Sequence, residues 1–253
     1  MLNYVEYGKE NKYDDDIFFQ KYSQMSRSQQ GLAGAGEWET LRKLLPDFKD
    51  KRVLDLGCGY GWHCIYAMEH GASSVVGVDI SHKMLEVAKE KTHFPQVEYK
   101  CCAIEDVEFP EESFDVILSS LAFHYVADYE ILVKKIYRIL KSGGTLVFTV
   151  EHPVFTAYGT QDWYYNEKGE ILHFPVDNYY YEGKRTAVFL GEKVTKFHRT
   201  LTTYLNTLLS NGFIINHIVE PQPPEYMMDI PGMQDEMRRP MMLIVSANKK
   251  VDR

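Results

Sequence analysis

The residues best suited to chemistry in this 253-residue chain surround a glycine loop. In the stretch RVLDLGCGYGWH, residues 52–63, an apolar segment is followed by Gly57, Gly59 and Gly61 at alternate positions. Glycines spaced this closely after a strand let the backbone approach a ligand or another segment. Asp55 precedes the loop, and Asp79 ends the next apolar segment. The pattern therefore predicts a ligand site that is flanked by two carboxylates.

The two carboxylates narrow the chemistry of that ligand. Dinucleotide folds carry an acidic residue about 20 residues beyond their glycines, where it binds a ribose hydroxyl. Asp79 suits that role, but Asp55 would repel a pyrophosphate at the loop and favour a positive group. Alone, the glycines could form only a tight turn, and Asp79 could be a mere neighbour of a helix-capping Ser81. Together they favour a nucleoside with a zwitterionic amino-acid tail, a description that S-adenosylmethionine fits.

Two histidines are candidates for catalytic proton transfer beyond such a ligand. His124 follows one apolar segment in SSLAFHYV, and His152 follows another in TVEHPVF, next to Glu151. A general base must come within about 2.6–3.2 Å of the proton that it removes. Both histidines could instead be hydrogen-bonded packing residues. Methyl transfer from a sulfonium can also proceed by alignment alone, without a catalytic residue.

Composition and charge exclude several classes of function. The formal charge is −8, with 28 basic and 36 acidic residues, which disfavours a nucleic-acid partner. No apolar run approaches the roughly 18 residues of a membrane span, and the polar N-terminal stretch does not resemble a signal peptide. The four cysteines form no C-x-x-C pair, so no metal site is expected. We therefore expect a cytoplasmic protein.

The segments that carry these residues alternate between strand and helix patterns. Strands are expected at 52–56, 74–80, 97–102, 114–120 and 145–150. Apolar strands that alternate with helices predict a parallel sheet covered on both faces. Right-handed crossovers and short connections favour an open, doubly wound α/β sheet. Ligands of such sheets bind at the carboxyl ends of the strands, which is where the loop and both histidines fall.

Helices are expected around these strands. The predicted ranges are 14–24, 37–45, a segment that ends near 70, one that begins at Ser81, one capped by Asp128, and 200–211. Apolar spacing places Ile17, Ile131 and Leu209 on the inward faces of their helices.

The alternation breaks at residues 152–199, which are rich in aromatic residues. Segments 186–190 and 193–197 predict a β-hairpin, and strands resume at 213–220 and 241–247. We expect one domain, 1–253, with N-terminal lid helices at 1–46, a cofactor-binding core at 47–151, a cap insertion at 152–199 and the C-terminal part of the sheet at 200–253. The aromatic residues could enclose an acceptor, pack the insertion or form a homodimer contact, since exposed hairpin edges pair readily.

Four stretches together resemble a known family. VLDLGCGYGWH, VVGVDIS, IEDVEFPEESFDVILSS and LKSGGTLVFT are similar, in order and spacing, to the motifs of class I S-adenosylmethionine-dependent methyltransferases. The chain more narrowly resembles the bacterial small-molecule branch, of the methyltransferase type 11 kind, related to quinone-biosynthesis enzymes. The resemblance is strong over about 50–150 and weaker over 200–248. It implies a Rossmann-like, mostly parallel seven-stranded sheet with an inserted β-hairpin cap.

The resemblance also implies roles for individual residues. Asp55 and Gly57 would hold the amino-acid end of the cofactor, and Asp79 would accept the ribose hydroxyls. Ala103 departs from the family, which often has an acidic residue there, so the backbone of Ile104 and the carboxylate of Glu105 would serve the adenine. The full set of expected cofactor-binding residues is Asp55, Gly57, Cys58, Gly59, Asp79, Ile80, Met84, Ile104, Glu105, Ser119 and Leu121.

The implied reaction is methyl transfer from S-adenosylmethionine to a small-molecule acceptor, through an oxygen, nitrogen or carbon nucleophile, giving S-adenosylhomocysteine. Alternatives are a methyltransferase that acts on RNA or protein, a catalytically silent S-adenosylmethionine-binding regulatory subunit, and a nicotinamide dehydrogenase. The residues that would choose the acceptor lie in the insertion and loops, where no motif identifies it.

Overall fold

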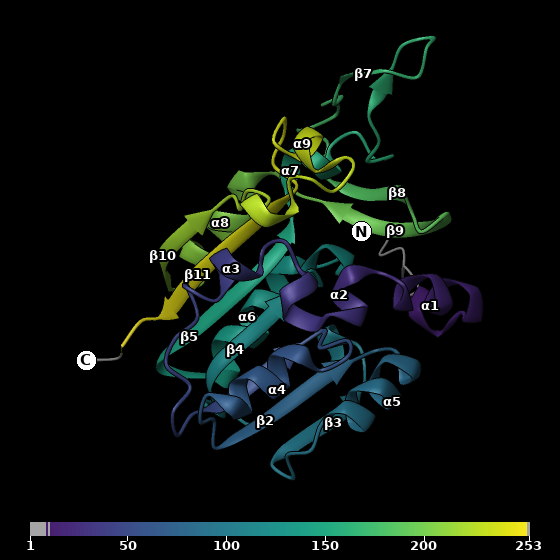
Figure 1. Cartoon of the computed structure of the whole chain (residues 1–253). Coiled ribbons are helices and arrows are strands. Elements are labelled where there is room, and N and C mark those ends of the chain that lie inside the picture. Colours follow the sequence, from purple (N-terminus) through teal and green to yellow (C-terminus); the bar gives the residue numbers. More distant parts are fainter. Residues whose placement is uncertain (1–8, 10, 252–253) are drawn as a thin grey trace.

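A seven-stranded sheet forms the centre of the computed structural model, which describes residues 9 and 11–251 (Figure 1). The strand order is β10-β11-β5-β4-β1-β2-β3. Strands β1 to β5 are parallel, whereas β11 runs antiparallel to both β5 and β10. The expected doubly wound, mostly parallel α/β sheet is therefore confirmed. The strands are β1 Arg52–Leu56, β2 Ser74–Asp79, β3 Val97–Cys101, β4 Phe114–Ser120, β5 Leu140–Glu151, β10 Phe213–Val219 and β11 Met242–Lys249.

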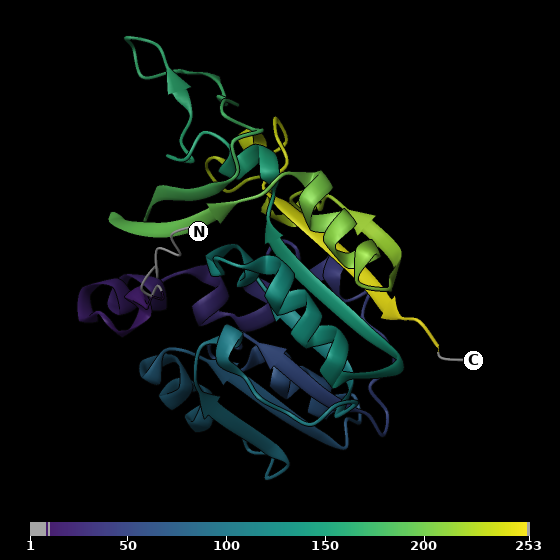
Figure 2. The ribbon, with the colours of Figure 1, turned by 180° about the vertical axis from the view of Figure 1, so that it is seen from behind.

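Helices cover both faces of the sheet. Helices α3, α4 and α5 lie on one face (Figure 1). Trp38 and Leu85 belong to the apolar cluster on that side. Helices α6 and α8 lie on the other face (Figure 2), and Ile136 and Leu208 belong to the second cluster. The helices are α1 Asp16–Ser23, α2 Ser26–Gln29, α3 Trp38–Leu41, α4 Trp62–Glu69, α5 His82–Lys91, α6 Tyr129–Ile139, α7 Pro153–Thr156, α8 Leu201–Ser210 and α9 Met233–Glu236. No helix within the described ranges is long and apolar enough to cross a bilayer.

Side-chain caps start five of the described helices, at Asp15, Ser81, Asp128, His152 and Thr200. Ser81, Asp128 and Thr200 each accept a hydrogen bond from a backbone N–H in the first turn. Such caps satisfy donors that have no partner inside the helix. Local chemistry therefore fixes where α5, α6 and α8 begin, as the sequence predicted.

Three residues expected to face inward are exposed instead. Ile17, Ile131 and Leu209 keep 61, 51 and 53% of their surface. Each helix buries only one stripe, and these residues lie at its edge, next to buried Phe18, Leu132 and Leu208.

Two element boundaries also differ from expectation. Helix α3 spans only Trp38–Leu41 of the predicted 37–45, and turns follow it. Strand β5 begins at Leu140 rather than at 145, because Leu140 pairs with Phe114 before the register shifts. Gly143 adopts a φ of +73° within this strand.

The region between β5 and α8 folds over one edge of the sheet. It contains α7, the short strands β6 Tyr164–Tyr165 and β7 Ile171–His173, and a hairpin of β8 Gly183–Phe189 with β9 Glu192–His198. The predicted hairpin is thus present and slightly longer. Phe18 of α1 packs against Ala187 and Val194 of the hairpin, so the N-terminal segment and the insertion meet (Figure 2).

Candidate active site

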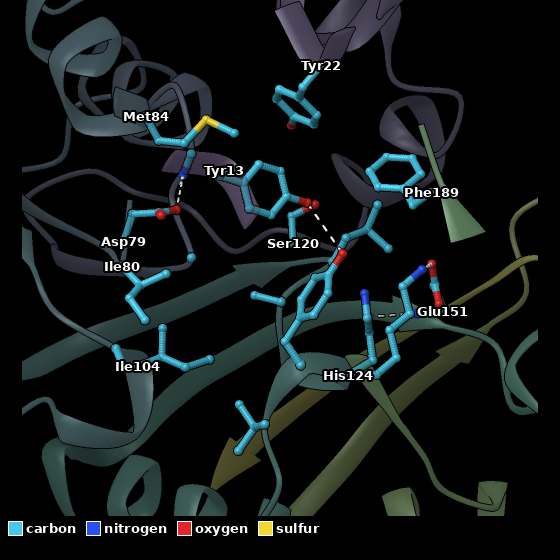
Figure 3. A pocket seen from close by; sticks show the side chains of 18 of the residues that line it. Tyr13, Tyr22, Asp79, Ile80, Met84, Ile104, Ser120, His124, Glu151 and Phe189 are labelled. Atoms are coloured by element: carbon cyan, nitrogen blue, oxygen red, sulfur yellow. Dashed lines mark hydrogen bonds and ion pairs between the residues drawn. The ribbon is translucent and has the colours of Figure 1, made fainter. Parts of the chain in front are cut away.

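A cavity of about 240 Å³ opens at the carboxyl ends of the parallel strands (Figure 3). The glycine loop after β1 and the ends of β2, β4 and β5 form its floor. Tyr13 and Tyr22 come from the N-terminal segment, and Phe189 and Lys196 come from the hairpin. The expected cofactor residues that line this cavity are Gly57, Gly59, Asp79, Ile80, Met84, Ile104, Glu105 and Leu121.

The glycine loop is shaped by backbone that other residues rarely adopt. Gly57 and Gly59 have φ values of +79° and +52°. A Cβ atom on Gly57 would lie 2.5 Å from the Cβ of Ala122, so close packing requires glycine there. A Cβ atom on Gly59 would meet no described atom within 4 Å, because that side faces open space. The loop therefore leaves room for a ligand directly against its backbone.

Asp79 is held rigidly at the edge of the cavity. Its Oδ2 accepts a hydrogen bond from Gly59 N at 2.8 Å, and its Oδ1 accepts one from Ser81 N at 2.9 Å. Burial raises the pKa of this carboxyl, against the opposing effect of these two hydrogen bonds. Each carboxylate oxygen has a further lone pair. The group is thus preorganised to accept two hydroxyl donors, as a ribose diol would supply.

Asp55 lies behind the loop rather than in the cavity lining. Its side chain is fully buried, and Oδ1 has no hydrogen-bond partner among the described residues. The Sγ of Cys64 lies 3.5 Å from Oδ2. Burial raises the pKa of Asp55 to about 7. A buried carboxylate with an unused acceptor fits a site that expects a positive group nearby.

Two other expected cofactor residues also lie outside the main cavity. Cys58 lines a smaller adjoining cavity of about 80 Å³, which shares Gly57 and Gly59 with the first. Ser119 is buried and donates its hydroxyl to Leu56 O at 2.8 Å, so it joins β4 to β1.

The adjoining cavity also contains Arg27. Its guanidinium nitrogen lies 3.0 and 2.9 Å from the two carboxylate oxygens of the buried Glu37. This ion pair holds Arg27 at a position where it lines both cavities.

The opposite end of the cavity carries a polar network. His124 is buried, and its Nδ1 accepts a hydrogen bond from Glu151 N at 3.4 Å. The Glu151 carboxylate binds Lys196 Nζ at 2.5 Å and Gln161 Nε2 at 2.5 Å. Burial lowers the pKa of His124 to about 4, so the ring is neutral at pH 7.

His152 does not line this cavity. Its Nδ1 accepts a hydrogen bond from Val154 N at 3.1 Å, which caps α7, and its Nε2 lies 2.9 Å from Glu220 Oε1. Of the two candidate bases, the structure brings only His124 to the cavity. In the part of the chain that the structure describes, no cluster of His, Cys, Asp or Glu is suited to a metal ion.

Lys196 is one of the lining residues that sequence reasoning missed. It belongs to KVTKFH in β9, where Val194, Lys196 and His198 share one buried face. Strand side chains alternate between faces, so a lysine two residues from a buried valine was a usable signal. Charged residues on a hairpin are usually exposed to solvent, so a lysine there is not expected to line a cavity.

Comparisons with known proteins agree with this geometry. A methyltransferase domain family model matches residues 54–148. A candidate S-adenosylmethionine-dependent methyltransferase from Listeria monocytogenes is 58% identical, with a TM-score of 0.84 over 87% of this chain and 99% of that one. An S-adenosylmethionine-dependent methyltransferase from Mesorhizobium loti is 41% identical, with a TM-score of 0.80 over 86% of this chain and 100% of that one.

A more local similarity is found to a protein that is named for its reaction. A ubiquinone biosynthesis O-methyltransferase from Coxiella burnetii is 35% identical over 112 residues, which are 44% of this chain and 47% of that protein. The full-length matches together with the domain model establish the family. This chain belongs to the class I S-adenosylmethionine-dependent methyltransferases, and S-adenosylmethionine is its cofactor.

Proposed function

We propose that this enzyme methylates a small-molecule acceptor bound in the cavity between Asp79 and His124. The observation that carries the proposal is the cavity itself, which runs from the rigid Asp79 carboxylate to the polar network at His124. The N-terminal segment and the hairpin both contribute to its walls, which suits a small acceptor better than a polymer. The charge of −8 and the similarity to a ubiquinone biosynthesis O-methyltransferase also favour a small molecule.

Residues of this chain would hold the cofactor at the Asp79 end. Asp79 would accept the ribose hydroxyls, while Ile80, Met84 and Ile104 would pack on the adenine. The backbone at Gly57 would lie against the amino-acid end, with the buried carboxyl of Asp55 behind it. When bound, S-adenosylmethionine supplies an electrophilic methyl group on a sulfonium sulfur.

The protein's remaining tasks are alignment and exclusion of water. Tyr13 and Phe189 close the cavity from two separate segments, and Tyr13 Oη lies 3.4 Å from Tyr125 Oη (Figure 3). In this proposal His124, which lines the cavity, would stand where the acceptor meets the methyl group. Free thiols at all four cysteines suit a reducing compartment, so our proposal includes a cytoplasmic location.

Calorimetric titration of Asp79→Ala with S-adenosylhomocysteine tests the cofactor assignment. The lost charged hydrogen bonds should weaken binding by about 1.5–3 kcal/mol, or about 10- to 150-fold. Asp79→Asn keeps one acceptor oxygen and should fall between wild type and Asp79→Ala.

The control for this titration is Glu86→Ala, at an exposed position on the adjoining helix α5, which should bind like wild type. Thermal unfolding of each variant separates weaker binding from loss of fold, since Asp79 also accepts two backbone hydrogen bonds. Unchanged affinity in a folded Asp79→Ala protein would remove Asp79 from the binding site.

A further inference from the structure

The proton on His124 has only one place to reside. The Nδ1 atom accepts a hydrogen bond from the backbone N–H of Glu151, so it must carry the ring's lone pair. A neutral imidazole then carries its proton on Nε2. No described residue makes a hydrogen bond to Nε2, and Figure 3 shows this nitrogen directed into the cavity. The cavity therefore faces an N–H donor, not a basic nitrogen.

A second donor stands beside the first. Lys196 is buried, lines the cavity, and donates to Glu151 Oε1 at 2.5 Å and to Gln161 Oε1 at 2.8 Å. An ammonium group has three protons, so one remains after these two bonds. The rings of Phe189 and Tyr125 lie 5.5 and 6.0 Å from Nζ and border the space next to it.

None of the charged groups around His124 is suited to remove a proton. On β5, the Glu151 carboxylate is already paired, and its pKa lies below the usual range despite burial. The burial that lowers the His124 pKa to about 4 is opposed by Glu151 and assisted by Lys196 of β9 and by Arg199. Arg199 follows β9 and donates to the backbone of the His124 segment at Phe123 O. Among the described residues, this end of the cavity thus offers donors without a base.

We propose that the methyl acceptor is an oxyanion, either a carboxylate or the ionised hydroxyl of an acidic phenol or enol, which is bound by His124 Nε2–H and the Lys196 ammonium. The inference rests on the proposed function and names its substrate class. A lone pair of the acceptor oxygen forms the new O–C bond, while the methyl–sulfur bond breaks and its electron pair stays on sulfur. An anion and a sulfonium become two neutral groups, so no proton has to leave. His124 then acts as a hydrogen-bond donor, in place of the general base that its position in the sequence suggested.

The tautomer of His124 can be measured without any ligand. In protein labelled with ¹⁵N at its nine histidines, long-range ¹H–¹⁵N spectra distinguish the two nitrogens of each ring, and His124→Gln identifies the signal that belongs to His124. We expect a neutral ring, protonated on Nε2, across the neutral pH range. A ring protonated on Nδ1, or one that titrates near pH 7, would overturn the inference. This outcome would leave the assignment of the cofactor site untouched.

The anion preference is tested with 4-nitrophenol, whose absorbance reports its ionisation. Bound to the S-adenosylhomocysteine-loaded enzyme, it should ionise at a lower pH than it does free in solution. His124→Gln keeps an N–H donor but no base, and should retain this shift. His124→Phe keeps the volume without the donor, and should weaken binding about tenfold or more.

Competition between 4-nitrophenol and other small ligands tests the preference for an anion further. Benzoate should displace 4-nitrophenol, whereas benzylamine should not, and methyl transfer to one oxyanion probe but not the other would tell a carboxylate acceptor from a phenol or enol. Neutral binding of 4-nitrophenol, preferential binding of benzylamine, or an equal response of the two His124 variants would overturn the inference. Failure of S-adenosylhomocysteine to bind the wild type would instead contradict the proposed function.

A double variant examines the contribution of Lys196. Lys196→Met alone leaves the buried Glu151 carboxylate unpaired, and such variants commonly unfold. Lys196→Met combined with Glu151→Gln removes both charges together. The double variant should fold, bind S-adenosylhomocysteine like wild type, and lose the preference for benzoate over benzylamine. A preserved preference in the double variant would exclude Lys196 from anion binding.

Discussion

Buried ionisable groups with few partners are concentrated around the cavity. Asp55 and Asp79 both have pKa values raised by burial, and burial lowers the pKa of His124 to about 4. Burial away from water disfavours the charged form of an ionisable group. The pKa of each of these three groups is therefore shifted in the direction that favours its uncharged form. A ligand that brings the complementary charge would offset this cost, which is typical of binding and catalytic sites.

Asp55 should give the free energy of unfolding a distinctive pH dependence. Its pKa is about 7 when folded and 3.8 in the unfolded reference, so the folded state keeps a proton that the unfolded state has released. Stability should therefore fall as the pH rises from about 4 to 7, by up to about 4 kcal/mol from this group. Asp55→Asn cannot ionise and should lack this contribution.

Urea unfolding of wild type and Asp55→Asn at several pH values measures the effect. The difference between the two proteins should widen with pH and level off above pH 7. Using the difference cancels the opposite contribution of His124, whose depressed pKa costs stability as the pH falls below 6.5. Parallel stability curves would show that Asp55 does not carry the raised pKa.

At the scale of elements, α1 and the hairpin of β8 and β9 hold each other over the cavity. Phe18 of α1 is fully buried against Ala187 and Val194, and its ring lies 5.7 Å from that of Phe189. Phe189 lines the cavity, so this contact links the N-terminal segment to a wall of the site. Among the residues that the structure describes, few other apolar side chains belong to this cluster, which makes it a weak point of the structure.

Phe18→Ala should loosen this contact without unfolding the sheet. Truncating a buried phenylalanine costs about 3–5 kcal/mol in a packed core, and here the loss falls on α1 and the hairpin. Hydrogen exchange of the amides in α1 and β8 should become about tenfold faster or more, while β1 and β4 stay protected.

The neighbouring residue supplies a matched control for that experiment. Ile17 lies on the same helix and is exposed, so Ile17→Ala should leave hydrogen exchange unchanged. Equal effects from Ile17→Ala and Phe18→Ala would mean that the whole helix, not the Phe18 contact, determines the exchange.

Strands and helix caps that depend on neighbouring residues could be predicted from the sequence. The surfaces on which those elements pack could not. Strand β1 and the caps at Ser81 and Asp128 depend on residues adjacent in the chain, and the structure reproduces them. Ile131 and Leu209 were wrongly assigned because helical spacing defines a stripe but not its edge. The sheet or helix on which each apolar stripe packs sets the edge of that stripe. The spacing of apolar residues in the sequence does not identify this packing surface.

At the scale of the whole molecule, the site is assembled from distant parts of the chain. Gly57, Gly59 and Asp79 were predictable as a cavity lining because two consecutive motifs of the sequence contain them. Lys196 and Glu151 are 45 residues apart, and Lys196 became part of the site only through the folding of the insertion. The cofactor end of the cavity is therefore readable from the sequence, whereas the acceptor end required the structure.

A crystal structure of the complex with S-adenosylhomocysteine tests the central claim most directly. The account predicts a ribose bound to the Asp79 carboxylate, an adenine against Ile80, and a sulfur atom that faces His124 across the remaining space. A cavity that stays empty at saturating ligand, or a ligand with its sulfur turned away from His124, would contradict the account.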